Sequence, residues 1–168
     1  NLTDLGIKIT YDSSILALPK KLLSKEVKII YTPAIKLNHP QLEFYSKQGN
    51  QILKRAEFLS KICENKKTLA IAGTHGKTTT TSILTHIFSK TNQSFTSFMG
   101  GFFRNKDSNF VKTGLDNFIV EADEYDRSFL KLHPTIACIT SVDPDHLDVY
   151  ETKEAFIEAF EKFSKQVD

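Results

Sequence analysis

Apolar residues recur along the chain in two alternating patterns. Short runs rich in β-branched and apolar side chains, of a length typical of strands, lie at 27–31, 51–54, 68–72, 118–120 and 135–140. Elsewhere apolar side chains return every three or four positions, which predicts helices with one packed face, over 40–48, 55–64, 77–89 and 152–165. Strands that alternate with helices favour an α/β fold with a mostly parallel sheet.

Polar residues and glycine mark the ends of two of these helices. The segment Asn38–Pro40 offers an N-cap for the first helix, with Pro40 near its first turn, and Gly49 ends the helix. Thr152 is placed to cap the last helix. Local chemistry therefore supports the helices that the apolar pattern predicts.

Charge divides the chain into two parts. Residues 1–66 contain eleven basic and six acidic side chains, a net charge of +5, whereas residues 67–168 contain eleven basic and fourteen acidic ones, a net charge of −3. This change predicts two domains that meet near Lys66. The whole chain carries only +2, so no strong field draws a polyanion to it, and we expect no nucleic-acid partner.

Composition places the chain among globular proteins, with 40% hydrophobic and 25% charged residues. No apolar run approaches the roughly 18 residues that a membrane-spanning helix needs, and the N-terminal residues lack the basic-then-apolar pattern of a signal peptide. We therefore expect a soluble, cytoplasmic protein with no membrane partner. Cys63 and Cys138 stand alone, without CxxC or zinc-site spacing, and are predicted to be reduced, structural thiols.

The sequence GTHGKTT at Gly73–Thr79 carries the strongest chemical signal. It lies between a predicted strand and a predicted helix, where backbone N–H groups hold phosphate oxygens. Lys77 would reach the terminal phosphates, and Thr78 would offer its hydroxyl to Mg²⁺. The usual P-loop spacing has glycine where this chain has Ile71, so the motif is a shortened variant; the alternative is a glycine-rich turn without a ligand. The predicted nucleotide-binding residues are Gly73, Thr74, His75, Gly76, Lys77, Thr78 and Thr79.

Four carboxylates follow the predicted strand at 118–120 within six residues. They would repel one another unless a cation or solvent relieved the repulsion, so a metal site is predicted. Glu121 continues directly from the strand and is best placed to face the glycine loop at the carboxyl edge of the sheet. A solvated acidic loop is the alternative, and it is the interpretation we favour for Glu124 and Asp126 taken singly.

A third polar segment, Asp143–Asp148, follows the next predicted strand. His146 lies there beside carboxylates at the same sheet edge, so it is a candidate metal ligand or a histidine oriented by Asp145 or Asp148. Taken alone, the pattern favours a hydrogen-bonded surface histidine. Its place beside the other two motifs supports the metal hypothesis.

The three motifs GTHGKTT, VEADEYDRSF and TSVDPDHLDVY, in this order, resemble those of the Mur ligases, the ATP-dependent amide-forming enzymes of peptidoglycan synthesis. The upstream stretch YTPAIKLNHPQLEFYSKQGNQILKRAEFL is similar to the UDP-substrate domain of that family. The resemblance implies part of a Rossmann-like substrate domain over 1–66 and part of a central P-loop ATPase domain over 67–168. The family's N-terminal glycine-rich loop and C-terminal domain have no counterpart in these residues, so the chain alone is expected to be inactive.

The resemblance also implies a reaction, the ATP-dependent ligation of L-alanine to UDP-N-acetylmuramate through an acyl phosphate. Lys77, Glu121 and His146 would be the catalytic residues. Thr78 and Glu121 would hold one Mg²⁺, and His146 a second. The residues implied in binding the UDP-sugar are Thr32, Arg55, Gly100 and Gly101.

Other interpretations stay open. A murein tripeptide recycling ligase shares the first two motifs but usually carries a longer insertion where this chain has the short connection 127–134. A module that binds a nucleotide or a UDP-sugar without catalysis belongs to a different functional class. Thr32 and Arg55 could equally be turn or surface residues.

Overall fold

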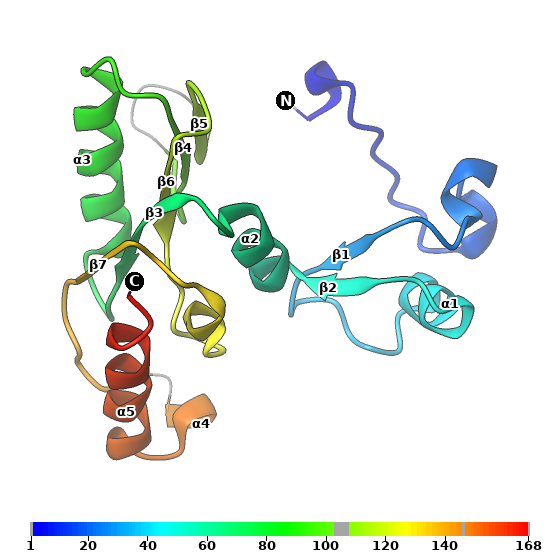
Figure 1. Cartoon of the computed structure of the whole chain (residues 1–168). Coiled ribbons are helices and arrows are strands. Elements are labelled where there is room, and N and C mark those ends of the chain that lie inside the picture. Colours follow the sequence, from blue (N-terminus) through cyan, green and yellow to red (C-terminus); the bar gives the residue numbers. More distant parts are fainter. Residues whose placement is uncertain (1, 103–107, 146, 168) are drawn as a thin grey trace. The chain divides into compact units, whose positions relative to one another are not determined.

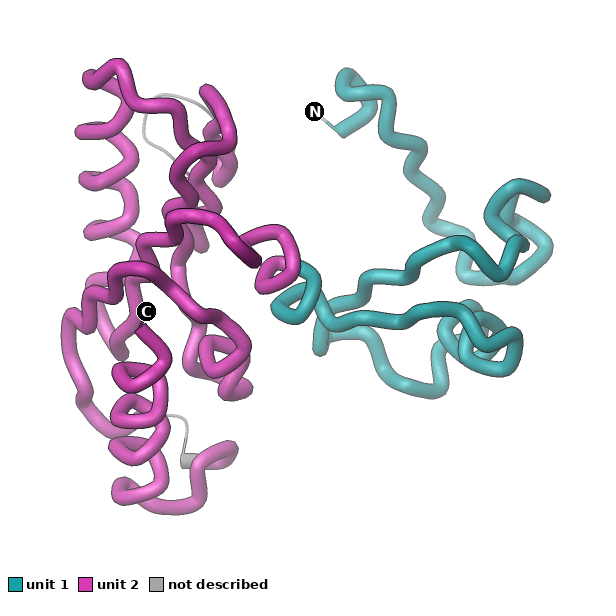
Figure 2. Tube along the Cα trace, in the orientation of Figure 1, with its two compact units in different colours: residues 1–58 teal, residues 59–168 magenta. Residues whose placement is uncertain are grey.

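The computed structural model of the protein describes residues 2–102, 108–145 and 147–167. Contacts divide the chain into two compact units, residues 1–58 and residues 59–168 (Figure 2). The division falls within helix α2 (Arg55–Cys63). The domain boundary that the charge pattern predicts near Lys66 stays a prediction.

Unit 1 contains a short parallel strand pair and one connecting helix (Figure 1). β1 (Ile29–Tyr31) pairs with β2 (Ile52–Lys54), and α1 (Pro40–Gln48) lies between them in the chain. The predicted order of strand, helix and strand is therefore confirmed. Three 3-10 helices precede β1, at Thr3–Leu5, Ile15–Ala17 and Lys20–Leu23.

The ends of α1 follow from proline and glycine. The N-cap is His39, within the predicted segment Asn38–Pro40, because Pro40 is the first helical residue and favours an extended conformation in the residue before it. Gly49 ends the helix as predicted, with a φ of 81° that favours glycine. Asn50 then anchors the chain, since its side-chain amide donates to the carbonyl oxygens of Ser24 and Val27, each at 2.9 Å.

Unit 2 contains a five-stranded sheet in the order β5-β4-β6-β3-β7. Four strands are parallel: β3 (Lys67–Ala72), β4 (Phe95–Phe98), β6 (Asn117–Glu121) and β7 (Ile136–Ile139). Only β5 (Phe110–Lys112) is antiparallel among the paired strands of this sheet within the described residues. The mostly parallel sheet is therefore confirmed, although the sequence did not predict β4 or β5.

Helices α3 (Lys77–Ser89) and α5 (Lys153–Ser164) cover opposite faces of this sheet. Successive side chains of a strand point to opposite faces. Ile71 of β3 and Ile119 of β6 pack in one apolar cluster, together with Leu84 of α3. Their neighbours in the strands pack in the other cluster against buried phenylalanines of α5; this second cluster includes Ala70, Ala72, Phe118, Val120, Phe156, Phe160 and Phe163.

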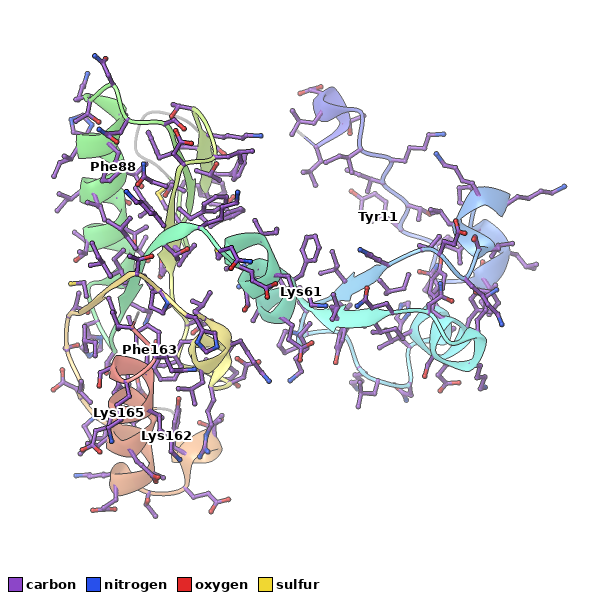
Figure 3. All side chains as sticks on the ribbon, viewed as in Figure 1. Tyr11, Lys61, Phe88, Lys162, Phe163 and Lys165 are labelled. Carbon is purple, nitrogen blue, oxygen red and sulfur yellow. The ribbon has the colours of Figure 1, made fainter. Side chains whose placement is uncertain are left out.

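Helix α5 shows the one-sided pattern that its sequence predicts. Phe163 is fully buried, whereas the side chain of Lys162 is 59% exposed (Figure 3). Thr152 caps the helix as predicted, because its hydroxyl oxygen accepts the N–H of Ala155 at 3.1 Å. The short helix α4 (Leu147–Tyr150) precedes it. Among the described helices, none combines the length and the apolar character needed to cross a membrane.

Strand β7 forms one edge of the sheet and leaves apolar side chains exposed. Ile136 and Cys138 line an apolar groove of about 320 Å³ together with Ile83 and Ile87 of α3. The two cysteines are free, as predicted, but they differ in access, since Cys63 is buried and Cys138 is exposed.

Candidate functional site

The predicted phosphate loop joins β3 to α3 at the carboxyl end of the parallel strands. Gly73 has a φ of 131°, and a Cβ added there would lie 2.2 Å from the Oγ1 of Thr140. Gly76 occupies the N-cap of α3 with a φ of 82°, and no side-chain hydrogen bond caps the helix at this residue. The positive φ favours glycine at both positions, and the first turn of α3 opens toward the loop.

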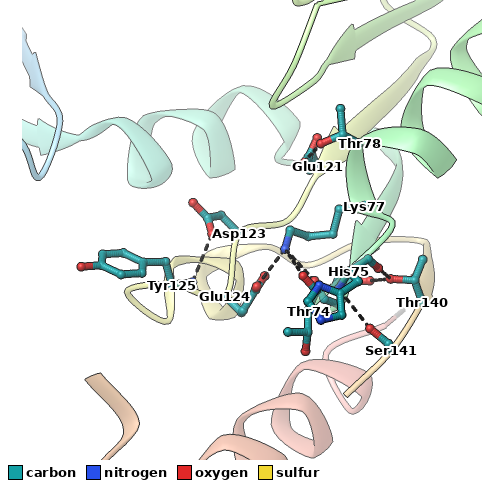
Figure 4. A network of polar contacts seen from close by, with 12 residues as sticks. Thr74, His75, Lys77, Thr78, Glu121, Asp123, Glu124, Tyr125, Thr140 and Ser141 are labelled. Atoms are coloured by element: carbon teal, nitrogen blue, oxygen red, sulfur yellow. Dashed lines mark hydrogen bonds and ion pairs between the residues drawn. The ribbon is translucent and has the colours of Figure 1, made fainter. Parts of the chain in front are cut away.

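The residues that follow β7 form hydrogen bonds with the loop (Figure 4). The N–H of Thr74 donates to the carbonyl oxygen of Ser141 at 3.1 Å, and the N–H of His75 donates to the Ser141 hydroxyl oxygen at 3.0 Å. The Thr74 hydroxyl donates to the carbonyl oxygen of Asp143 at 2.7 Å. Thr140 donates its hydroxyl to the carbonyl oxygen of Ala72 at 3.1 Å. The third sequence motif therefore supports the first.

Lys77 turns its side chain back over the loop. Its Nζ lies 2.6 Å from the carbonyl oxygen of Gly73 and 2.8 Å from Oε1 of Glu124. The pair is well shielded, since the side chain of Lys77 is 15% exposed and that of Glu124 only 2%. The ammonium group of Lys77 therefore lies at the loop, where the predicted phosphate site needs a positive charge.

Glu124 corrects the sequence analysis, which favoured a solvated carboxylate at this position. The residue is 1% exposed, because the chain turns inward after β6. Arg127 takes a left-handed conformation with a φ of 58° and donates its N–H to the Glu124 carbonyl oxygen at 3.0 Å. The Tyr150 hydroxyl donates to the same oxygen at 2.5 Å, and Tyr150 is itself 1% exposed. Burial, with a further contribution from the neighbouring carboxylates, raises the pKa of Tyr150 to about 12, so its hydroxyl stays protonated and able to donate.

Glu121 lies where the sequence analysis places it. β6 pairs with β3 so that Glu121 stands opposite Ile71, just before the loop. Its Oε1 accepts the Thr78 hydroxyl at 2.8 Å, and its Oε2 accepts the N–H of Gly100 at 2.7 Å. A hydroxyl and a carboxylate are ligands that suit Mg²⁺ when phosphate and water oxygens complete the octahedron. Within the described ranges, no group of three or more His, Cys, Asp and Glu side chains could hold a metal ion.

The predicted substrate residues are distributed over both units. Gly100 and Gly101 lie beside the Thr78 and Glu121 pair, since a Cβ at Gly101 would be 3.0 Å from Cγ2 of Thr78. Thr32 follows β1 and Arg55 begins α2, both exposed in unit 1. The roles of these four residues stay predictions.

The candidate metal ligand His146 lies outside the described residues. Two contributors to the site escaped the sequence analysis, namely the loop support at Thr140 and Ser141 and the hydroxyl of Tyr150. The TS pair at Thr140 and Ser141, where the run at 135–140 ends, is the one sequence signal that could have pointed to the loop support.

A family model described as the Mur ligase middle domain matches residues 71–168, which is more than half of the chain. The UDP-N-acetylmuramate–L-alanine ligase of Christiangramia forsetii is 44% identical over 168 residues, covering 99% of this chain and 37% of that protein. The ligase of the same name from Flavobacterium johnsoniae is 43% identical over 167 residues, with the same coverage.

Solved structures agree with this relationship. The UDP-N-acetylmuramate–alanine ligase of Thermotoga maritima matches with a TM-score of 0.85 at 29% identity, over 99% of this chain and 38% of that one. A UDP-N-acetylmuramate:L-alanyl-gamma-D-glutamyl-meso-diaminopimelate ligase from Neisseria meningitides matches with a TM-score of 0.72 at 23% identity, over 83% and 49%, which shows the fold alone. This chain spans about 37% of the length of the curated relatives it matches. With the family model over residues 71–168 and the loop, lysine and carboxylate brought together at one sheet edge, the chain belongs to the Mur ligase family.

Proposed function

We propose that the chain forms the nucleotide-binding part, and some of the sugar-binding part, of a ligase that joins L-alanine to UDP-N-acetylmuramate at the expense of ATP. The observation that carries the proposal is the convergence of Lys77, Thr78 and Glu121 on one glycine loop at the carboxyl edge of a parallel sheet. The identities of 44% and 43% to alanine ligases support this amino acid.

The proposed reaction proceeds in two steps. The carboxylate oxygen of UDP-N-acetylmuramate attacks the γ-phosphorus of ATP, the bond to the β-phosphate oxygen breaks, and ADP leaves. The amine of L-alanine then attacks the acyl carbon, phosphate leaves with the bonding electrons, and the amine loses a proton as the amide forms. Both steps concentrate negative charge on phosphate oxygens, so the protein must supply cations and N–H donors there.

Lys77 and the loop supply that environment. The backbone N–H groups at the start of α3 would hold phosphate oxygens, and the Lys77 ammonium would neutralise charge on the transferring group. Mg²⁺, held by Thr78 and Glu121, would supply further neutralisation of the β- and γ-phosphates. His146 would serve a second ion near the acyl phosphate.

Substrate contacts follow the same proposal. Gly100 and Gly101 would lie against the UDP-sugar, because they adjoin the Thr78 and Glu121 pair. Thr32 and Arg55 would contact the substrate from unit 1. ATP and UDP-linked sugars are cytoplasmic metabolites, so this reaction places the protein in the cytoplasm.

Two measurements test the proposal. The 168-residue chain should bind ATP more tightly with Mg²⁺ than without it, as titration calorimetry would show. The full-length protein should release ADP when given UDP-N-acetylmuramate and L-alanine. Absence of Mg²⁺-dependent ATP binding would reject the nucleotide site. ADP release with the tripeptide L-alanyl-γ-D-glutamyl-meso-diaminopimelate but not with L-alanine would favour a recycling ligase, and binding without turnover in the full-length protein would indicate a non-catalytic module.

A further inference from the structure

The ammonium group of Lys77 is bonded entirely by acceptors of its own chain. Besides Oε1 of Glu124 at 2.8 Å and the carbonyl oxygen of Gly73 at 2.6 Å, it approaches the carbonyl oxygen of Thr74 at 3.4 Å. An ammonium has three N–H donors. In this arrangement each of them has a protein acceptor, so a phosphate oxygen must displace at least one before it can bind Lys77.

Glu124 is the fixed member of the pair. Its backbone carbonyl accepts from both Tyr150 and Arg127, and its side chain is 2% exposed. Its second carboxylate oxygen, Oε2, has no hydrogen-bond partner in the part of the chain that the structure describes. Lys77, by contrast, carries its charge on a flexible four-carbon stem. When the pair separates, Lys77 therefore moves and Glu124 stays.

Removing the cation from a buried carboxylate costs free energy. The cost is higher for Glu124, because its Oε2 already lacks a hydrogen-bond donor among the described residues. The separated state is therefore disfavoured while the phosphate site is empty. A nucleotide that needs Lys77 binds with an affinity reduced by the small fraction of molecules in which Lys77 is released.

We propose that Glu124 is a positioning residue that holds Lys77 inside the loop until the phosphates of a nucleotide displace it, an inference that rests on the proposed nucleotide site. Glu124 acts on the nucleotide only through Lys77. Weakening the pair releases the lysine and tightens the binding of ligands that carry phosphates, and leaves the binding of adenosine unchanged.

The variant Glu124→Gln tests this in the full-length protein. Glutamine keeps the shape and an acceptor for Lys77 but removes the charge, so the Kd of Mg²⁺-ATP should fall about five- to tenfold in titration calorimetry. The Kd of adenosine should not change. Asp123→Asn is the matched control, because Asp123 is exposed in the same loop and its Oδ1 accepts the Tyr125 N–H at 3.1 Å, a bond that the amide oxygen can keep. This control should bind Mg²⁺-ATP like the wild type.

A double-mutant cycle separates this role from simple repulsion between Glu124 and phosphate. In a Lys77→Met background, Glu124→Gln should leave the Kd of Mg²⁺-ATP unchanged, because no lysine remains to be released. Equal tightening in both backgrounds would overturn the proposal in favour of direct repulsion. An unchanged or raised Kd in the single variant would overturn it in favour of a purely structural role.

A conservative variant keeps the test valid if Glu124→Gln fails to fold. Glu124→Asp keeps the charge but withdraws the carboxylate from Lys77 by one methylene, so it should also lower the Kd of Mg²⁺-ATP; an unchanged or raised Kd would overturn the proposal. The proposed function has a separate outcome. A wild-type protein that binds no Mg²⁺-ATP contradicts the nucleotide site itself, whereas normal wild-type binding with unresponsive variants contradicts only the role of Glu124.

Discussion

Replacement of Gly73 by alanine should destabilise unit 2 more than replacement of Gly76 by alanine. The φ of 131° lies in the range that favours glycine, and adopting it costs another residue about 1–3 kcal/mol. The new Cβ would also lie 2.2 Å from Oγ1 of Thr140 and 2.9 Å from the backbone nitrogen of Ser141. Because the second contact is with backbone, β7 or the loop must shift, at a further cost of about 1–3 kcal/mol. We expect a total loss of about 2–6 kcal/mol for Gly73→Ala.

Gly76→Ala provides the control for backbone strain. Its φ of 82° also favours glycine, but the nearest atom to an added Cβ, in Thr140, is 3.7 Å away, which is ordinary contact. We expect a loss of about 1–2 kcal/mol. Urea unfolding of the chain, followed by circular dichroism, compares the two variants through their midpoints at equal slope. Equal losses in the two variants would refute the close packing of Gly73 against the residues after β7.

Four further predictions concern single groups. Lys77→Ala should lower ATP turnover in the full-length protein at least about 10²- to 10³-fold, measured as ADP release; near-normal turnover would remove the phosphate-site assignment. Glu121→Gln should raise the Mg²⁺ concentration needed for ATP binding about tenfold, measured by titration, and an unchanged Mg²⁺ dependence would contradict the metal assignment. A thiol reagent at pH 8 should label Cys138 in the folded chain but Cys63 only after unfolding, because burial raises the pKa of Cys63 to about 11; mass spectrometry identifies the site, and equal labelling would contradict the burial. Thr152→Ala should cost about 1 kcal/mol in urea unfolding by removing the cap of α5, and no loss would show that the cap contributes nothing.

The sequence predicted those elements whose apolar pattern is long or uniform. Helix α3 begins at Lys77 and ends at Ser89 as predicted, and β3 and β6 are apolar runs buried on both faces. β4 and β5 escaped prediction, because their short sequences, FTSF and FVK, form neither a continuous apolar run nor a regular alternation of apolar and polar side chains. Their pairing with β6 and with each other, rather than local propensity, makes them strands.

The site was predictable where chain geometry alone determines it. Glu121 is the last residue of β6, the parallel strand beside β3, so its contact with Thr78 needs only the order of the strands and the direction in which they run. The burial of Glu124 cannot be predicted from strand order and direction alone. It depends on a left-handed residue, Arg127, and on a hydroxyl from Tyr150, 26 residues further along the chain. An acidic run gives no information about either contact, and so a solvated loop was the reasonable but wrong expectation for Glu124.

The position of Ile71 explains why two motifs far apart in the chain form one structural unit. A standard P-loop spacing would place glycine there, but Ile71 is 1% exposed in the sheet, so the loop has only the residues from Gly73 to Gly76 in which to turn. A turn this short can form few backbone hydrogen bonds among its own residues. The N–H groups of Thr74 and His75 instead donate to oxygen atoms of Ser141. The close approach of that residue is possible only because position 73 lacks a Cβ. The missing Cβ of Gly73 and the acceptors of Ser141 therefore belong to one packed turn, which gives a physical reason for the two motifs to occur together.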